Sequence, residues 1–292
     1  MNEDGDSSPT DGSAADTLRD GHERAAIPDD VEAPGPAWLR ALGRFGIGVA
    51  RHAGRSAILI AATVRALGQP RRYLHETFVQ AKRIGVDSLG LVILVAALSG
   101  AVLAQQTGYQ FTTLPMWVVG EGVVSGMITE LGPVLTAIIL AGRVGAGMGA
   151  ELGTMRVTDQ IDALRTLNRD PVLELIVPRV LAGIIVMIPL VVLANAAGIF
   201  SGWLTGITLL PMTTHQYVYG ARAIYHSAQL VLSLVKALAF GFAVSFIGCY
   251  VGIQAQGGAA GVGRTTTNAV VSIIVAIMVL DVLLAPIYRA VS

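Results

Sequence analysis

The chain has 292 residues, of which 53% are hydrophobic and 14% are charged. Soluble domains carry roughly 25% charged residues, so this composition excludes an ordinary water-soluble protein and favours a membrane protein. The formal net charge is zero, yet residues 1–36 hold ten acidic and only two basic side chains, which leaves the rest of the chain basic.

Residues 1–36 form the first of three predicted parts. They are rich in Asp, Ser, Gly and Pro and nearly free of large apolar residues, so they cannot bury enough surface to offset the entropy of ordering. They show no basic start followed by an apolar run, which argues against a signal peptide. We therefore expect a disordered acidic tail in the cytoplasm.

Residues 37–84 are predicted to lie at the membrane surface. At 100° per residue, four arginines between residues 40 and 55 share one face of a helix, and apolar side chains occupy the opposite face. Such a helix is typical of the headgroup region of an anionic leaflet; a soluble amphipathic helix docked on a partner is the alternative. The residues expected at the membrane are Trp38, Arg40, Arg44, Phe45, Arg51 and Arg55.

Residues 85–292 are predicted to contain five transmembrane helices. Residues 88–120 carry no charge, and this run exceeds the roughly 20 residues needed to cross the hydrocarbon. The predicted fold class is an all-α integral membrane protein, in which the interfacial amphipathic helix precedes the five spans. These spans are 87–109, 122–142, 180–204, 229–251 and 266–288.

The distribution of Lys and Arg predicts the orientation. Arginines concentrate before the first span and between the second and third spans, whereas residues 105–121 contain no Lys or Arg. Cytoplasmic loops carry the excess of positive charge, so the N-terminus and the 142–171 connection are predicted to be cytoplasmic. Five spans then place the C-terminus in the periplasm, and we expect the bacterial inner membrane as the location.

Three spans each carry an ionisable residue, namely Glu130, Lys236 and Asp281. Each lies about seven or eight residues from the outer end of its span, or roughly 10–12 Å at 1.5 Å per residue. Charges that face lipid at this depth are unfavourable, so we expect an inward-facing polar layer with Lys236 between the carboxylates or paired with one of them. The layer is either a structural ion pair or part of a lipid pathway.

Glycines recur at every fourth position near the ends of the second and third spans. This spacing lets helix backbones approach closely and predicts helix packing, within or between subunits, rather than ligand binding. The glycines are Gly145, Gly149, Gly198, Gly202 and Gly206.

The 142–171 connection is predicted to hold a short helix. Val157, Ile161 and Leu164 share one side of it, and Pro171 marks its end because proline disfavours a helical conformation in the preceding residue. A helix here, instead of a plain polar loop, indicates docking of a cytoplasmic partner. A helix resting on the membrane surface is the alternative.

Residues 130–164 read ELGPVLTAIILAGRVGAGMGAELGTMRVTDQIDAL, and this run closely resembles the signature of the MlaE/YrbE family of ABC transporter permeases. Residues 170–190 and 259–271 are similar to the same family. The resemblance extends from about residue 38 to the C-terminus, so only the acidic tail lies outside it.

The resemblance implies a homodimeric permease that moves lipids, phospholipids above all, between the inner and outer membranes. It implies a separate cytosolic ABC ATPase that binds ATP and Mg, a periplasmic MCE-domain partner, and no cofactor bound by this chain. The helix after the second span would be the coupling helix, at residues 151–167, and the 256–267 loop would make a lesser contact with the ATPase. The coupling residues are Glu151, Thr154, Arg156, Asp159, Asp162 and Arg165.

Other chemistry is not indicated. Residues 258–265, GAAGVGRT, come within one residue of the phosphate-binding pattern GxxxxGK[ST], but the lysine is missing and no strand is expected before them. The histidines and Cys249 show no metal-ligand spacing, and no nucleophile is accompanied by a base in a hydrolytic arrangement. The basic stripe lacks the aromatic interleaving expected for single-stranded nucleic acid. We therefore predict a transporter subunit with no catalytic or metal site, and no nucleic-acid partner.

Two alternatives stay open. A proton-coupled secondary transporter would use Glu130, Lys236 and Asp281 as a relay, since intramembrane ionisable residues often serve in that way, and it would need no ATPase. A non-transporting membrane anchor of an assembly would carry no lipid after purification.

Overall fold

The computed structural model describes residues 47, 50, 54–65, 68, 70–110 and 115–286. The chain divides into two compact units, residues 1–53 and 54–292. In the first unit residues 47 and 50 are helical, and the second unit holds all the elements named below. The acidic tail 1–36 lies outside the described residues.

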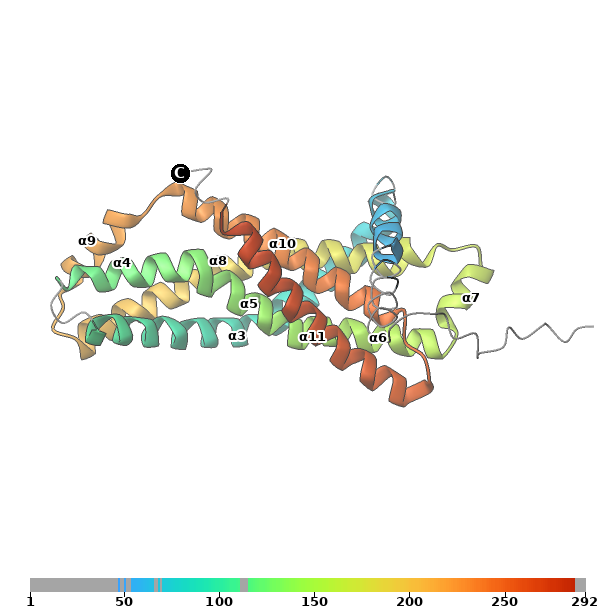
Figure 1. Ribbon diagram of the computed structural model, residues 1–292. Helices are drawn as coiled ribbons and strands as arrows, with labels where there is room; N and C mark the ends of the chain where they lie inside the picture. The colour runs from blue at the N-terminus through green and yellow to red at the C-terminus, as the bar shows by residue number, and fades with distance from the viewer. Residues whose placement is uncertain are drawn as a thin grey trace, which may run out of the picture. The chain divides into compact units, whose positions relative to one another are not determined.

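Five long helical stretches, joined by short connections, make up the second unit (Figure 1). The first is α3 (Pro70–Gln110), which follows a helical segment at residues 54–65. The others are the stretch made of α4 (Trp117–Gly126), the π-helix η2 (Met127–Leu131), α5 (Gly132–Leu140), the π-helix η3 (Ala141–Gly145) and α6 (Ala146–Val157); the π-helix η4 (Val172–Ile176) with α8 (Val177–Leu209); α10 (Ser227–Gly252); and α11 (Gly258–Leu284). Two short helices lie between them, α7 (Gln160–Thr166) and α9 (Thr214–Ile224).

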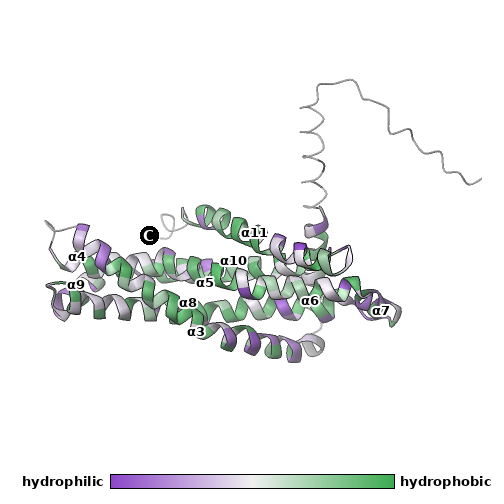
Figure 2. Ribbon diagram, turned by 90° about the horizontal axis from the view of Figure 1, so that it is seen from below, coloured by the Kyte–Doolittle hydropathy of each residue, from purple (hydrophilic) through white to green (hydrophobic). Residues whose placement is uncertain are grey.

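All five stretches are long and apolar enough to cross a membrane. Figure 2 shows hydrophobic residues along most of the length of these helices. The predicted all-α class and the number of spans are confirmed. Some ends differ from the prediction, because α3 begins at Pro70 and α11 at Gly258. Helical hydrogen bonding continues into polar residues that hydropathy does not count. Of the predicted 256–267 loop, residues 258–267 are therefore helical and the prediction is wrong for them. Helix α3 runs through the predicted part boundary at residues 84 and 85.

The connection after the second span also differs from the prediction. The predicted single helix at 151–167 is in fact two, since residues 151–157 complete α6 and α7 begins at Gln160. Asp159 separates them with a φ of 57°, and Asn168 has the same φ just after α7. Asp and Asn adopt this left-handed conformation more readily than most residues. Residues that readily adopt this conformation therefore lie on both sides of α7 and limit its length.

Close helix contacts organise the unit. Helix α8 packs along both α3 and α10, and α10 also contacts α6 and α11. At Gly100 of α3 the two backbones approach so closely that a Cβ atom would collide with the backbone oxygen of Gly198 in α8. Fully buried apolar side chains such as Phe240 and Met187 fill the core between the helices. Small residues thus set the helix spacing and large ones fill the remaining space.

Helices α7 and α9 lie at opposite ends of the long helices (Figures 1 and 2), and we call these the α7 end and the α9 end. A capping box starts α9, in which the side chain of Thr213 accepts from the backbone N–H of Gln216. The buried Tyr217 donates its hydroxyl to the backbone oxygen of Ile199 at 2.9 Å. Burial raises the pKa of Tyr217 above its ordinary value, so the hydroxyl remains a donor that ties α9 to α8.

Candidate functional site

Lys236 is the centre of a charged group formed by three spans. Its Nζ atom lies 2.8 Å from Glu130 Oε2 and 2.7 Å from Asp281 Oδ1. Glu130 is in η2, Lys236 in α10 and Asp281 in α11. The lysine side chain is fully buried, whereas 48% of the Glu130 side chain is exposed. The structure thus brings together the three residues of the predicted polar layer.

The same lysine also satisfies a backbone group of the second span. Lys236 Nζ donates to the backbone oxygen of Thr129 at 2.9 Å. In an α-helix this oxygen would accept from the residue four positions later, which is Pro133 and has no N–H. The contact with Asp281 is an ion pair without hydrogen-bond alignment. Loss of the ammonium would therefore leave two carboxylates and one carbonyl oxygen without their cation.

Uncharged polar side chains continue from Lys236 along α10 toward the α9 end. Gln229, Ser233 and Lys236 are buried and share one helix face, since they are spaced four and then three residues apart. Asn195 of α8 donates from Nδ2 to Ser233 Oγ at 3.3 Å. Among the described residues, the side-chain oxygens of Asn195 and Gln229 have no hydrogen-bond partner. Sequence reasoning missed this row, although the 229, 233 and 236 spacing was a usable signal.

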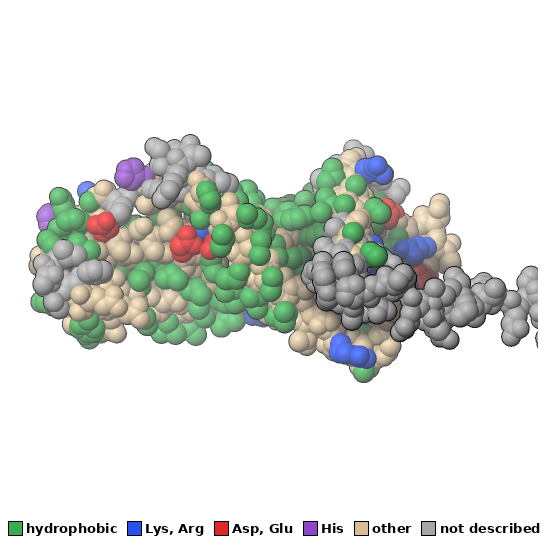
Figure 3. All heavy atoms as spheres, viewed as in Figure 1, with side chains coloured by type: hydrophobic (Ala, Val, Ile, Leu, Met, Phe, Trp, Pro, Cys, Tyr) green, Lys and Arg blue, Asp and Glu red, His purple; other side chains and the backbone are tan. Residues whose placement is uncertain are grey.

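The charged group behaves as one unit. A buried ammonium among apolar helices requires a counter-charge, and here two carboxylates supply it. Glu130 is the more exposed of the two, so it can accept a hydrogen bond or a cation while Lys236 stays fixed. The face in Figure 3 is mostly hydrophobic between the two ends, with few acidic side chains in its middle. The arrangement suits contact between Glu130 and a polar group beside an apolar surface.

The predicted coupling residues separate into two clusters at the α7 end. Asp162 of α7 lies between Arg156 and Arg165, with N–O distances of 2.7 and 3.1 Å. Glu151 instead faces the helices, with its carboxylate 2.7 Å from Arg83 of α3 and 3.3 Å from Arg179 of α8.

Other coupling residues hold local contacts or lie exposed. Thr154 donates its hydroxyl to the oxygen of Ala150 at 2.8 Å, and Asp159 is exposed in the break before α7. Sequence reasoning missed Arg83 and the buried Arg179, since neither position shows a pattern that points to Glu151. Leu167, at the end of α7, is 71% exposed.

The predicted packing glycines all face neighbouring elements of the same chain. A Cβ on Gly145 would meet Ile273 and one on Gly149 would meet Ala269, both of α11. A Cβ on Gly198 would meet Met127, one on Gly202 would meet Val123, and one on Gly206 would meet Met212.

The remaining predicted positions are placed as follows. Of the predicted membrane contacts, Arg55 is exposed in the 54–65 helix. Residues 258–265 belong to the first turns of α11, so this segment lacks the open loop of a phosphate-binding motif. Within the described part of the chain, no three His, Cys, Asp or Glu side chains group as metal ligands. The predicted contacts that lie outside the described residues are Trp38, Arg40, Arg44, Phe45 and Arg51.

Comparison with known proteins agrees with this architecture. The model of the permease MlaE family matches residues 77–287. A Rickettsia prowazekii protein named "probable ABC transporter permease protein" is 37% identical over 248 residues, which cover 85% of this chain and 96% of that protein. A protein of the same name from Synechocystis sp. is 35% identical over 72% of this chain and 81% of its own length. The chloroplastic protein TRIGALACTOSYLDIACYLGLYCEROL 1 of Arabidopsis thaliana is 34% identical over 72% of this chain and 61% of its own length.

The family match covers all five spanning stretches except the start of α3. It includes the charged group around Lys236 and the whole segment between the second and third spans. The apolar helices, the family match and the relatives lead to the same conclusion. The chain belongs to the MlaE permease family and is a multi-pass membrane permease of an ABC transporter.

Proposed function

We propose that this permease moves lipids, with phospholipids as the substrate class, between the inner and outer membranes of a bacterium. It works as a homodimer, its ATPase partner is a cytosolic subunit that binds ATP and Mg, and a periplasmic MCE-domain protein exchanges lipid with it. The observation that carries the proposal is the group of Glu130, Lys236 and Asp281 inside an apolar bundle. A lipid needs polar contacts for its headgroup and apolar ones for its chains, and this bundle offers both.

Two further observations support a lipid substrate and a dimer. The Arabidopsis relative is named after a glycerolipid, trigalactosyldiacylglycerol. Helix α11, which carries Asp281, also exposes large apolar side chains, among them Val275, Val279 and Val282. Exposed apolar surface of this kind suits contact with lipid or with a second subunit.

The charge distribution supports a cytoplasmic α7 end. Arg143 and Arg156 lie in the last part of the second spanning stretch, and Arg165 and Arg169 lie in the connection that includes α7. Such a concentration of arginines is expected on the cytoplasmic side of a membrane. Asp162 is held by neighbouring arginines, and Leu167, just after the helix, is exposed. An exposed apolar side chain on a short, braced helix suits insertion into a groove of the ATPase.

The test is reconstitution of the full-length permease with its ATPase in liposomes that contain a headgroup-labelled phospholipid. We expect lipid transfer to an acceptor to require ATP and to fall when Glu130→Gln removes the more exposed carboxylate. Transfer driven by an imposed proton gradient without ATP would support the proton-coupled alternative instead. Absence of both transfer and co-purified lipid would support the membrane anchor.

A further inference from the structure

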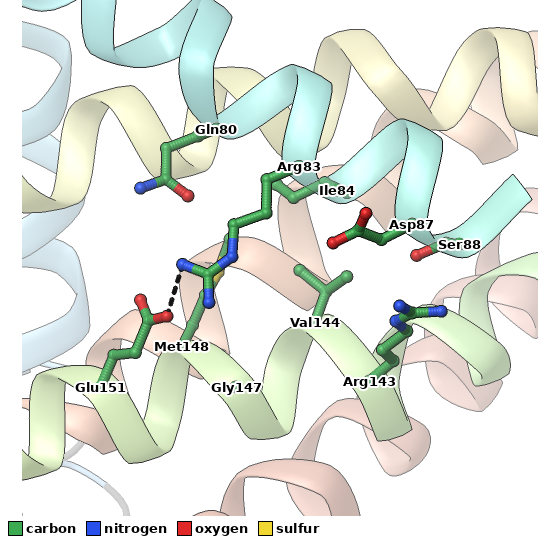
Figure 4. A pocket seen from close by; sticks show the side chains of 10 residues that line it. All are labelled: Gln80, Arg83, Ile84, Asp87, Ser88, Arg143, Val144, Gly147, Met148 and Glu151. Carbon is green, nitrogen blue, oxygen red and sulfur yellow. Dashed lines mark ion pairs between the residues drawn. The ribbon is translucent and has the colours of Figure 1, made fainter.

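A separate cavity of about 220 Å³ lies between α3 and the η3–α6 stretch, toward the α7 end. Figure 4 shows its lining side chains, which come from one face of each of these two elements. None of them belongs to the group around Lys236. The cavity is smaller than the roughly 300–1,000 Å³ of typical sites for drug-sized molecules, so it fits a small polar group.

One wall of the cavity is already neutralised. Arg83 and Glu151 form an ion pair of 2.7 Å across it, drawn as the dashed line in Figure 4. The second carboxylate oxygen of Glu151 lies 3.3 Å from the buried Arg179. These three residues link α3, α6 and α8. Their charges are paired with one another, so other residues provide the polar groups in the opposite part of the cavity.

That opposite part holds one cation and one anion that are not paired. Arg143 and Asp87 both line the cavity, and among the described residues neither has an ion-pair or hydrogen-bond partner. Beside them lies Ser88, whose fully buried hydroxyl also has no partner in the described part of the chain. A buried hydroxyl without a partner is unfavourable, so a ligand oxygen at this place would complete the site.

The position along the helices identifies the kind of ligand. Ser88 begins the charge-free part of α3, and its 23 residues to Gln110 rise by about 34 Å, close to the thickness of the hydrocarbon layer. Arg143 is the first charged residue after the apolar run 131–142 of the second span. Both helices therefore change from apolar to charged at the cavity. This level corresponds to the boundary between lipid chains and headgroups.

We infer that this cavity binds the headgroup of a zwitterionic phospholipid that carries a primary ammonium group. The phosphodiester is held by Arg143 and Ser88, and the ammonium donates hydrogen bonds to Asp87. One unpaired cation and one unpaired anion match this headgroup better than a purely anionic one. The inference does not depend on the proposed transport function, because a permease in any bilayer meets lipids.

The test measures lipid retained by the purified full-length permease, using native mass spectrometry. The probes are phosphatidylethanolamine, phosphatidylcholine and phosphatidylglycerol with identical acyl chains. We expect preferential retention of phosphatidylethanolamine, and roughly tenfold weaker retention of all three lipids in Arg143→Gln, the loss of one charge-assisted contact. Asp87→Asn should reduce phosphatidylethanolamine to the level of phosphatidylcholine. Arg222→Gln and Glu121→Gln, toward the α9 end, are the charge controls.

A steric pair of variants tests the cavity without changing charge. A Cβ on Gly147, which lines the cavity, or on Gly142, which does not, would meet no atom within 4 Å. Gly147→Leu should therefore fill the cavity and lose the preference, while Gly142→Leu keeps it. Equal binding by these two variants, or equal retention of the three lipids by the unchanged protein, would overturn the inference. Displacement of the lipid by soluble phosphoethanolamine at similar concentration would show a site for a soluble anion and would also overturn it. If Arg143→Gln does not fold, the comparison of Gly147→Leu with Gly142→Leu still tests the inference.

Discussion

Lys236 is a residue whose surroundings make single substitutions costly. Its side chain has no exposed surface, and it contacts two carboxylates and one backbone oxygen. A neutral side chain of similar length would keep the packing but leave the carboxylates without a cation. The loss of stability when Lys236 is replaced therefore depends on whether a carboxylate partner is replaced with it.

Lys236→Met alone should lower the free energy of unfolding by about 3–5 kcal/mol, the usual result of leaving a buried partner charged and unpaired. Adding Asp281→Leu should recover most of the folded yield, because it removes the more buried of the two carboxylates that Lys236→Met leaves without a cation. Thermal unfolding in detergent, followed by light scattering, measures both variants. Glu130→Gln, which keeps the shape, is the control and should cost less than Lys236→Met.

Transport by the double variant then separates the two roles of the polar layer. Recovered folding together with recovered transport would mark the layer as a structural ion pair. Recovered folding without transport would place it in the path of the lipid. If the double variant were less stable than Lys236→Met, the pairing of Lys236 with Asp281 would be refuted.

At the scale of elements, the α3–α8 contact depends on the absence of side chains. A Cβ on Gly100 would collide with backbone atoms of Gly198, whereas Gly90 of the same helix has no atom within 4 Å of its Cβ position. Backbone atoms cannot move aside as a flexible side chain can. Gly90 and Gly100 therefore have opposite expected responses to substitution by alanine.

Gly100→Ala should separate α3 from α8 and lower the melting temperature, with a cost of about 1–3 kcal/mol for an overpacked contact. Gly90→Ala should be neutral or stabilising, because alanine is favoured over glycine inside a helix by up to about 1 kcal/mol. Melting temperatures of the two variants in the same detergent make the comparison. A Gly100→Ala protein as stable as Gly90→Ala would contradict the close contact.

The α7 segment is a second element with a specific expectation. Leu167 is exposed and has no role in the bundle core, so Leu167→Glu should preserve folding and weaken association with the ATPase at least tenfold. Co-purification of the ATPase with the tagged permease gives the measurement. Thr166→Ala, in the adjacent position, is the control, since it removes only a hydroxyl that donates to Ala163. Undiminished association of Leu167→Glu would remove α7 from the interface.

At the scale of the whole molecule, five spans place the α7 and α9 ends on opposite sides of the membrane. The only cysteine, Cys249, is buried, so it can be replaced by alanine to provide a background for labelling. His215 of α9 and Gln160 of α7 are both exposed. Cysteines at these two positions report the sidedness of each end.

In right-side-out vesicles, an impermeant maleimide should label His215→Cys and not Gln160→Cys. In inverted vesicles the result should be reversed, because positive charge concentrates near α7 and such segments stay cytoplasmic. Gel-shift labelling provides the measurement, and detergent-solubilised protein serves as the control for reactivity. Labelling of both positions from one side would rule out five spans.

Some features of this protein follow from the sequence by itself. Long apolar runs predict the number of spans, because a helix must satisfy its own backbone in lipid. The depths of Glu130, Lys236 and Asp281 follow from helix rise once the direction of each span is known. For these local or one-dimensional properties, the sequence contains the whole physical cause.

Other features were decided only by the tertiary structure. The partners of Glu151 are Arg83 and Arg179, which come from α3 and α8 and are 68 and 28 positions away, so no spacing along the chain indicates them. The break at Asp159 divides a continuous amphipathic pattern, which a periodicity argument cannot detect. The cavity beside Ser88 is lined by α3 and by the η3–α6 stretch, two segments far apart in the sequence, so it exists only once the helices have packed together.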